Sequence, residues 1–179
     1  MKAFKEVGLK KSFRFLIFTL AYVLYRGLIF PQFRGPFLRI LGAKIGKNCI
    51  VHSVRFFNYY RTGFSGLTLG DDCFIGDECL LDLASPITLG NQVTLAERVT
   101  ILTHMNVGYE DHPLQKSFPP SSKAVVIRRG SFLGAGATVL NGVEVGEESF
   151  VAACALVRDN VPPFTLVGGV PAKTVRSLK

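Results

Sequence analysis

An aliphatic residue recurs at every sixth position along most of this chain. One unbroken run consists of Ile127, Leu133, Val139, Val145, Val151 and Val157. The same spacing links Leu69, Ile75 and Leu81, then, after a slip of two residues, Leu89, Leu95, Ile101 and Val107, with Ile45 and Val51 earlier in the chain. A helix repeats every 3.6 residues and a strand every second residue, so neither alone gives this period. A six-residue period is typical of a parallel β-helix.

A second set of compact residues follows four positions after the aliphatic ones. It includes Cys49, Cys73, Cys79, Val93, Val99, Met105, Ala137 and Ala155. Because side chains alternate across a strand, both sets are expected to point inward. Three six-residue sides give a coil of about 18 residues, and coils stack about 4.8 Å apart. The pattern therefore predicts an all-β solenoid of about five coils over residues 43–169.

Two stretches interrupt the period. Arg55–Gly66 keeps it poorly, which predicts one irregular coil. The segment between Val107 and Ile127 is longer than the period requires and predicts a loop protruding over residues 108–124. Loops held on a rigid scaffold often carry functional sites, although tolerance of an insertion is the alternative. Glycine often follows the aliphatic residue, at positions 46, 70, 76, 90, 134 and 146. We expect these glycines to supply unusual backbone angles at tight corners.

Most of the positive charge lies at the start of the chain. The net charge is +8, and residues 1–40 contribute eight basic residues against Glu6. The remaining solenoid is nearly neutral and lacks the basic face that nucleic-acid binding requires. The apolar run Phe15–Tyr25 is too short to span a bilayer, which takes about 20 residues. No small-residue cleavage site follows it, so a cleaved secretion signal is not indicated.

The apolar run predicts a helix within a basic segment of residues 1–42. Pro31 and Pro36 are expected to mark the linker into the repeats. Two compatible interpretations stay open. The helix covers the end or side of the solenoid, or residues 1–40 contact the inner surface of the cytoplasmic membrane through apolar and basic side chains.

Three of the four cysteines occupy the compact inward position, where cysteine acts as a small hydrophobic residue. No CxxC pair occurs, so a cysteine zinc site is not indicated. Cysteine used in this way fits a reducing compartment, and we expect a cytoplasmic protein.

A candidate proton-transfer pair lies just before the predicted loop. His104 follows the inward Ile101 by three residues. Leu81 and Ile101 are separated by one coil plus the slip, so Asp82 and His104 are expected on adjacent coils of the same side. A carboxylate beside an imidazole can hold one tautomer of a base. An ordinary surface pair is the alternative.

Four motifs carry a family resemblance: LGAKIGKNC, ITLGNQVTLAERVTILTH, VVIRRGSFLGAGATVLNGVEVG and VRDNVPPFTLVGGVPAK. With them, residues 42–176 resemble the hexapeptide-repeat acetyltransferases, in particular the maltose and galactoside acetyltransferases and the colanic-acid-type polysaccharide O-acetyltransferases. The resemblance implies a left-handed parallel β-helix, a C-terminal tail over residues 170–179 that serves the CoA site, and a homotrimer with active sites between subunits.

The resemblance also implies acetyl-CoA as co-substrate, no metal, and direct transfer to a sugar hydroxyl of an exopolysaccharide, capsule or lipid-linked glycan. The family's catalytic histidine falls on His104 and its acceptor-binding aspartate on Asp82. An asparagine that assists the site in sugar acetyltransferases falls on Phe74. For CoA, the resemblance implies backbone groups near Ala135 and Ala153 and the side chains of Arg158, Lys173 and Arg176.

Alternatives from other classes stay open. An N-acetyltransferase acting on an amino sugar would share the same motifs. A non-catalytic β-helix could present the basic segment to a membrane. A zinc carbonic anhydrase on a similar solenoid would need three histidines, and His52 lies several coils before His104 and His112. The role of His112 is open.

Overall fold

A computed structural model describes residues 2–179, with side chains from residue 12 onward. The body is built from three sheets of short strands. The first sheet stacks β1 (Lys44–Ile45), β4 (Leu67–Leu69), β7 (Ile87–Leu89), β12 (Val125–Ile127) and β15 (Glu144–Val145). The second stacks β2 (Ile50–Val51), β5 (Phe74–Ile75), β8 (Thr94–Leu95), β13 (Phe132–Leu133), β16 (Phe150–Val151), β18 (Thr165–Gly168) and β19 (Lys173–Ser177). The third stacks β3 (Arg55–Phe57), β6 (Leu80–Asp82), β9 (Thr100–Ile101), β14 (Thr138–Val139) and β17 (Leu156–Val157).

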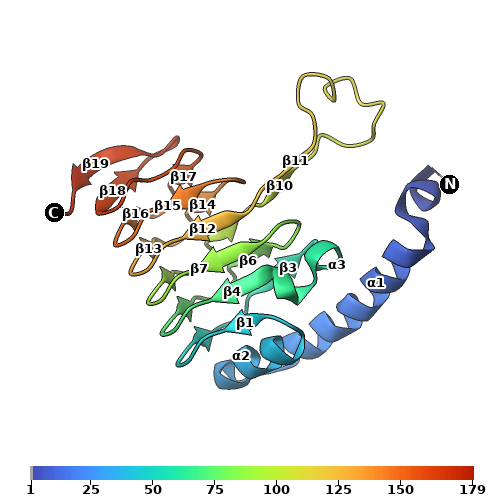
Figure 1. Cartoon of the computed structure of the whole chain (residues 1–179), viewed down its shortest axis with the longest axis horizontal. Helices are drawn as coiled ribbons and strands as arrows, with labels where there is room; N and C mark the ends of the chain where they lie inside the picture. The colour runs from blue at the N-terminus through green and yellow to red at the C-terminus, as the bar shows by residue number, and fades with distance from the viewer. Residues whose placement is uncertain (1) are drawn as a thin grey trace.

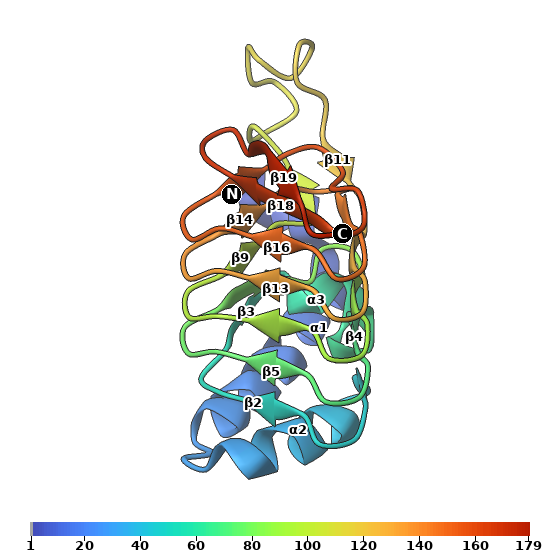
Figure 2. The same cartoon turned by 90° about the vertical axis from the view of Figure 1, so that its left-hand side faces the viewer.

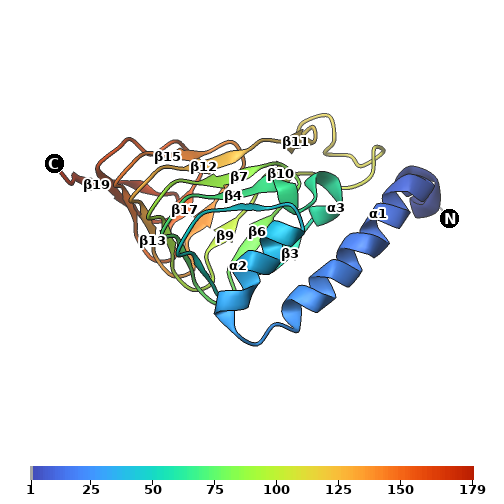
Figure 3. The ribbon, with the colours of Figure 1, turned by 60° about the horizontal axis from the view of Figure 1, so that its bottom comes forward.

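Successive strands pass from one sheet to the next, so the chain winds as a parallel β-helix (Figure 2). Viewed toward its end, the stack has a triangular outline (Figure 3). Parallel pairing brings residues one coil apart into register, for example Leu69 with Leu89 and Leu95 with Leu133. The parallel solenoid predicted from the period is confirmed. At the C-terminal end β19 departs from it and pairs antiparallel with β18.

The periodic residues form the core. Every aliphatic residue of the predicted series is buried except Val107, which is partly exposed together with Met105. The prediction was wrong at Val107 and Met105 because the chain leaves the solenoid at His104. There β10 (His104–Met105) pairs antiparallel with β11 (Ser121–Ser122) and carries the protruding loop (Figure 1). Cys49, predicted to point inward in the first coil, is also only partly buried.

The corner glycines serve a different purpose from the one predicted. Gly46 and Gly134 do not have positive φ angles. A Cβ atom on Gly46 would lie 2.3 Å from the Gly70 carbonyl oxygen, and one on Gly134 would lie 2.6 Å from the Ala153 nitrogen. Glycine is needed there because the backbone of the next coil occupies the space of a side chain. The left-handed residue comes two positions later, as at Asn48 (φ 53°).

The inward cysteines link neighbouring coils. The thiols of Cys73 and Cys79 are buried and donate to the carbonyl oxygens of Gly90 and Ala96, each at 3.1 Å. None of the four cysteines forms a disulfide. Their structural use agrees with the sequence prediction.

The coil predicted to be irregular contains two inserted elements. After β3 the chain forms α3 (Tyr59–Thr62) and the 3-10 turn η1 (Phe64–Gly66) before it enters β4. Asn58 begins this insertion in the left-handed conformation, with φ 55°. Asparagine tolerates this conformation better than most residues. The insertion places Asn58 at the edge where the third sheet passes into the first.

Two helices precede the solenoid: α1 (Lys2–Arg26) and α2 (Pro31–Ile40). Proline was expected to mark a linker, but Pro31 opens α2 and Pro36 lies within it. Pro31 favours the start of α2, because a residue in the first turn needs no partner for its N–H and the fixed φ of proline suits a helix. The linker is instead residues 27–30. None of the described helices combines the length and apolar character needed to cross a membrane.

Both helices pack on the first coils. Helix α2 lies across the N-terminal end of the stack (Figure 3), with Leu38 fully buried. Helix α1 places the Tyr22 ring 5.4 Å from that of Tyr59, and the Tyr25 ring 5.5 Å from that of Phe56, centroid to centroid. The interpretation that the leading helix covers the solenoid is thus confirmed for one side of α1.

Candidate active site

His104 and Asp82 meet at the edge where the third sheet passes into the first. Asp82 ends β6 and His104 begins β10, one coil further along. The Nδ1 atom of His104 is hydrogen-bonded to the Oδ2 atom of Asp82. Because the carboxylate accepts, the proton lies on Nδ1 and the Nε2 lone pair is left to act as a base. The two residues that the period placed on adjacent coils are in direct contact.

Asn58 joins this pair from the irregular coil. Its Nδ2 atom donates to Oδ1 of Asp82 at 2.8 Å and lies 3.4 Å from Nδ1 of His104. The sequence-based assignment missed Asn58. The resemblance implied an asparagine at position 74, where the chain has Phe74. The broken period of Arg55–Gly66 was the one signal that this coil carried something besides core residues.

The Asp82 carboxylate is fully buried and its acceptor sites are filled. Besides Asn58 and His104, the backbone N–H groups of Ala84 and Thr103 donate to it at 3.1 and 2.9 Å. Burial alone would raise the pKa of Asp82, but the hydrogen bonds from His104, Asn58 and Thr103 hold that pKa below its ordinary value. Asp82 is therefore a fixed carboxylate with no lone pair directed to solvent.

The His104 side chain is 27 % exposed, so one side of the ring is open. The Phe57 ring stands edge-on to it at 6.3 Å between centroids. The backbone of His104 is held by β11, through the pairing of His104 with Ser122. An accessible imidazole fixed by a buried carboxylate has the geometry of a general base.

The residues implied for CoA lie toward the C-terminal end of the stack. Arg158 follows β17 on the same edge as His104 and pairs with Asp159 at 3.2 Å. Lys173 and Arg176 are exposed on β19, in register with Gly168 and Leu166 of β18. Three cationic side chains at one end can bind phosphate groups.

Ala135 and Ala153 lie on a different edge, where the second sheet passes into the third. They stack on each other, because the N–H of Cys154 donates to the carbonyl of Ala135 at 2.9 Å. Neither alanine donates its own N–H to a group within residues 12–179. One chain therefore does not bring Ala135 and Ala153 together with His104.

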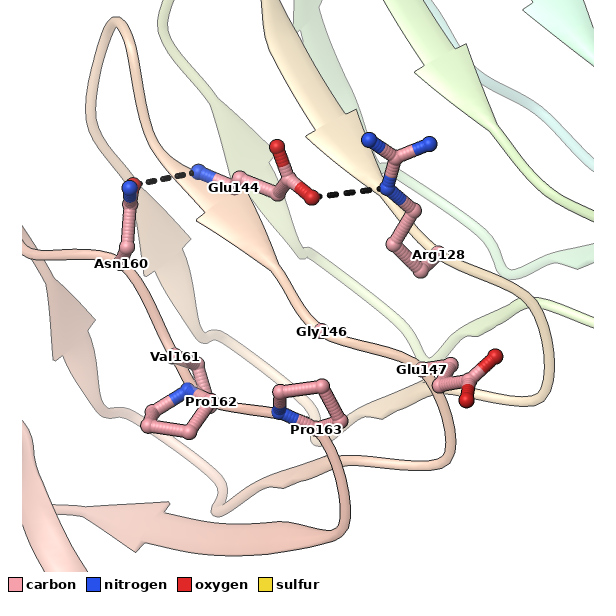
Figure 4. A pocket seen from close by; sticks show the side chains of 8 residues that line it. All are labelled: Arg128, Glu144, Gly146, Glu147, Asn160, Val161, Pro162 and Pro163. Carbon is pink, nitrogen blue, oxygen red and sulfur yellow. Dashed lines mark hydrogen bonds and ion pairs between the residues drawn. The ribbon is translucent and has the colours of Figure 1, made fainter.

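A cavity of about 600 Å³ lies elsewhere, on the outward side of the first sheet (Figure 4). In it, Arg128 pairs with Glu144 at 2.8 Å, and the Glu144 N–H donates to Asn160. Pro162 and Pro163 form the opposite wall. Its Arg128 and Glu144 neutralise each other, so this cavity lacks the accessible base that His104 provides.

The other histidines lie apart from the pair. His52 follows β2 at the edge between the second and third sheets, with Nδ1 3.4 Å from Asp77. The Nδ1 atom of His112 accepts from the Leu114 N–H within the protruding loop. Among the described residues, no group of three or more His, Cys, Asp or Glu side chains is arranged to hold a metal. The three histidines therefore do not form the zinc site of a carbonic anhydrase.

Comparison with known proteins identifies the repeat. The family model for the hexapeptide repeat of succinyl-transferase matches residues 66–101 and 125–157. A 2,3,4,5-tetrahydropyridine-2,6-dicarboxylate N-acetyltransferase from Enterococcus faecalis is 48% identical over 60 residues, which cover 34% of this chain and 26% of the relative. The chain thus spans about a quarter of the length of the curated relatives it matches.

Solved structures match over nearly the whole chain. A hexapeptide-repeat-containing acetyltransferase from Vibrio cholerae has a TM-score of 0.81 at 24% identity, covering 96% of this chain and 94% of that one. A structure of the Vibrio protein complexed with acetyl coenzyme A has a TM-score of 0.67 at 25% identity, with coverages of 90% and 85%. A maltose O-acetyltransferase from Clostridium difficile has a TM-score of 0.82 at 21% identity, with coverages of 96% and 90%.

Proposed function

Because this chain belongs to the hexapeptide-repeat acetyltransferases, we propose that it transfers an acetyl group from acetyl-CoA to a sugar hydroxyl of a glycan. The observation that carries the proposal is the Asn58–Asp82–His104 arrangement, which leaves one imidazole nitrogen available as a base. The Vibrio cholerae relative in complex with acetyl coenzyme A supports the choice of donor.

In the proposed reaction His104 acts as general base. Its Nε2 accepts the proton of the acceptor hydroxyl while that oxygen attacks the thioester carbonyl carbon. The carbon–sulfur bond then breaks, and His104 returns the proton to the sulfur of CoA. Bringing both substrates to one imidazole replaces a bimolecular encounter in solution with a positioned reaction. No enzyme-bound acetyl intermediate is required.

We assign Asp82 and Asn58 to positioning His104. The resemblance implied contact between Asp82 and the acceptor, but a fully buried carboxylate with filled acceptor sites has no means of direct contact. Its charge stabilises the imidazolium that forms as His104 takes the proton. Asn58 holds the other carboxylate oxygen and so fixes the orientation of Asp82.

For the donor, we propose that Arg158, Lys173 and Arg176 bind the phosphates of CoA. All three are exposed. The unengaged N–H groups of Ala135 and Ala153 would hold amide oxygens of the pantetheine arm. Because these alanines and His104 lie on different edges of one chain, we propose that the site is completed between neighbouring subunits of a homotrimer.

The outward side of the second sheet supports this assembly. Its strands align a row of mostly apolar outward side chains: Ile50, Phe74, Thr94, Phe132, Phe150 and Leu166. The rings of Phe132 and Phe150 stack at 4.8 Å between centroids. A continuous apolar row on a sheet surface is typical of a face covered by another subunit.

The acceptor we propose is part of an exopolysaccharide, capsule or lipid-linked saccharide, acetylated in the cytoplasm at the inner face of the membrane. The maltose O-acetyltransferase of similar fold favours a sugar hydroxyl. The Enterococcus faecalis relative instead favours an amine, because it is an N-acetyltransferase with 48% identity over 60 residues. N-acetylation of an amino sugar is therefore the second candidate, and His104 would deprotonate the ammonium group.

The test is release of the CoA thiol from acetyl-CoA in the presence of free sugars, lipid-linked saccharides and amino sugars. Thiol release with a hydroxyl acceptor, abolished by His104→Ala, is the expected result. Release only with amino sugars would replace the first candidate by the second. If neither the hydroxyl acceptors nor the amino sugars support thiol release, both candidates are overturned.

A further inference from the structure

Helix α1 presents an apolar stripe on the side that faces away from the solenoid. We call the six residues of this side the outer stripe: Phe13, Leu16, Ile17, Leu20, Val23 and Leu24. Their side chains are between 48% and 64% exposed. Their spacing of three and four residues places them along one side of a helix. Single exposed apolar residues are ordinary, but a continuous stripe of six marks a surface that binds something.

The outer stripe is not the side of α1 that packs on the solenoid, because the opposite side of the helix makes those contacts. Phe18, Tyr22 and Tyr25 pack on the first coil, and Thr19 Oγ1 lies 3.3 Å from Tyr59 Oη. These contacts hold the helix against the solenoid and fix which side faces outward. Figures 1 and 3 both show α1 along the flank of the stack, with open space on its outer side.

Exposed apolar residues also follow α1 in the chain. Ile29 is 81% exposed, and Phe30 and Phe33, whose rings stand edge-on at 6.2 Å, are 58% and 56% exposed. Along the chain, these residues extend the series of exposed apolar side chains from Phe13 in α1 to the start of α2. An extended surface of this kind fits a broad planar partner better than a small ligand.

Charge distinguishes the two broad partners that could cover the stripe. Residues 1–40 carry eight basic residues and one acidic residue. A second copy of α1 would bring the same positive charges alongside, and like charges disfavour such pairing. An anionic bilayer surface attracts these charges while its acyl boundary accepts the apolar side chains. Arg14, Arg34 and Arg39 contribute less, because each donates to a backbone carbonyl, of Arg61, Leu28 and Ile45 respectively.

We propose that the outer stripe of α1 binds the surface of a bilayer containing anionic phospholipids, with the helix lying in the plane of the interface. The binding follows from the stripe and the flanking charges alone and does not depend on the proposed acetyl transfer. It uses a side of α1 that makes no core contact, so it requires no change in the fold.

The test is co-sedimentation of the full chain with vesicles of phosphatidylcholine alone and of phosphatidylcholine with about one third phosphatidylglycerol. The double variant Leu16→Ser/Leu20→Ser removes two exposed apolar residues of the stripe. Leu114→Ser, at a residue that is 48% exposed on the protruding loop, is the matched control. The double variant Lys10→Gln/Lys11→Gln tests the charge contribution. All measurements are repeated in the His104→Ala background, so that binding is scored without activity.

We expect the parent chain to bind the anionic vesicles, and to bind them less tightly as salt is added. Binding should be about tenfold or more weaker in the stripe variant than in the parent, and also weaker in the lysine variant than in the parent. Leu114→Ser should leave binding unchanged. Equal thermal unfolding of the variants shows that the fold is kept. Absence of binding by the parent chain, or binding that the stripe variant retains, overturns the proposal. A parent that sediments as a larger oligomer than the stripe variant in the absence of vesicles also overturns it, because the stripe would then be covered by a second copy.

Discussion

His104 and Asp82 are 22 residues apart in the sequence, yet the Nδ1 atom of one is hydrogen-bonded to the Oδ2 atom of the other. The contact arises because one coil of the solenoid returns the chain to the same edge. Asn58, on the coil before that of Asp82, donates to the other oxygen of the Asp82 carboxylate. The three residues therefore come from three successive coils, and the stacking of the coils sets their separation.

Replacing His104 by Ala should lower acetyl transfer by about 10²-fold or more, because the acceptor hydroxyl loses its base. The thiol-release assay measures the loss, and the sedimentation mass should stay that of the parent. His52→Ala is the control, since His52 pairs with Asp77 on another edge. Near-parental transfer by His104→Ala would remove His104 from the mechanism.

Replacing Asn58 by Gly should lower kcat by about 10-fold or more while leaving KM for acetyl-CoA nearly unchanged, because the imidazole is held less precisely. Glycine accepts the positive φ of this position, so the backbone is not strained. Asn48→Gly is the matched control: Asn48 has φ 53° and donates to Asp72 at 3.0 Å, away from the site. An equal fall in kcat for both variants would show that the effect of Asn58 is structural.

The free energy of unfolding should decrease in acid because Asp82 becomes protonated. Its pKa is lowered in the folded chain, so the unfolded chain binds a proton first as the pH falls below about 4, the ordinary pKa of Asp. The stabilisation is present above that value and is lost as the pH drops through the lowered folded pKa. Urea unfolding between pH 6 and pH 3, roughly the range that brackets this titration, should show a shallower decline for Asp82→Asn than for the parent. Parallel declines would contradict the prediction.

The cysteines should react unequally with iodoacetamide. Burial raises the pKa of Cys73 to about 11 and that of Cys79 to about 12, so both stay protonated and covered near neutral pH. Cys154 is exposed and adjoins Ala153, and should react first. Peptide mapping by mass spectrometry reads the order, and CoA should slow the labelling of Cys154 if it binds at this corner. Labelling of Cys79 before unfolding would contradict the assignment.

A charge on the apolar row of the second sheet should weaken the trimer. Phe150 is 38% exposed and stacks on Phe132, so Phe150→Asp places a carboxylate in the proposed subunit contact. Analytical ultracentrifugation should show a trimer for the parent and smaller species for the variant. Leu114→Asp on the protruding loop is the control. A trimeric Phe150→Asp variant would place the subunit contact on another face.

The six-residue period was sufficient to predict the core. It depends on local alternation and on the need to bury aliphatic side chains, and both are written in the sequence. Ile101 and Val139, for example, are buried and paired across the third sheet. The period also placed Asp82 and His104 on neighbouring coils, because stacking converts a separation of one coil into contact. It carries no information on handedness, which the family resemblance alone implied.

Only the tertiary structure determined the features that depend on close contact between distant backbone segments. The glycine at position 134 is required by the Ala153 backbone of the next coil, not by its own φ angle. Asn58 reaches Asp82 because an insertion turns the chain at that corner, and no period describes an insertion. The outward side of α1 is likewise fixed by which side packs on the first coil. Residue spacing predicts what is buried, whereas the meeting of side chains at an edge depends on the path of the backbone through space.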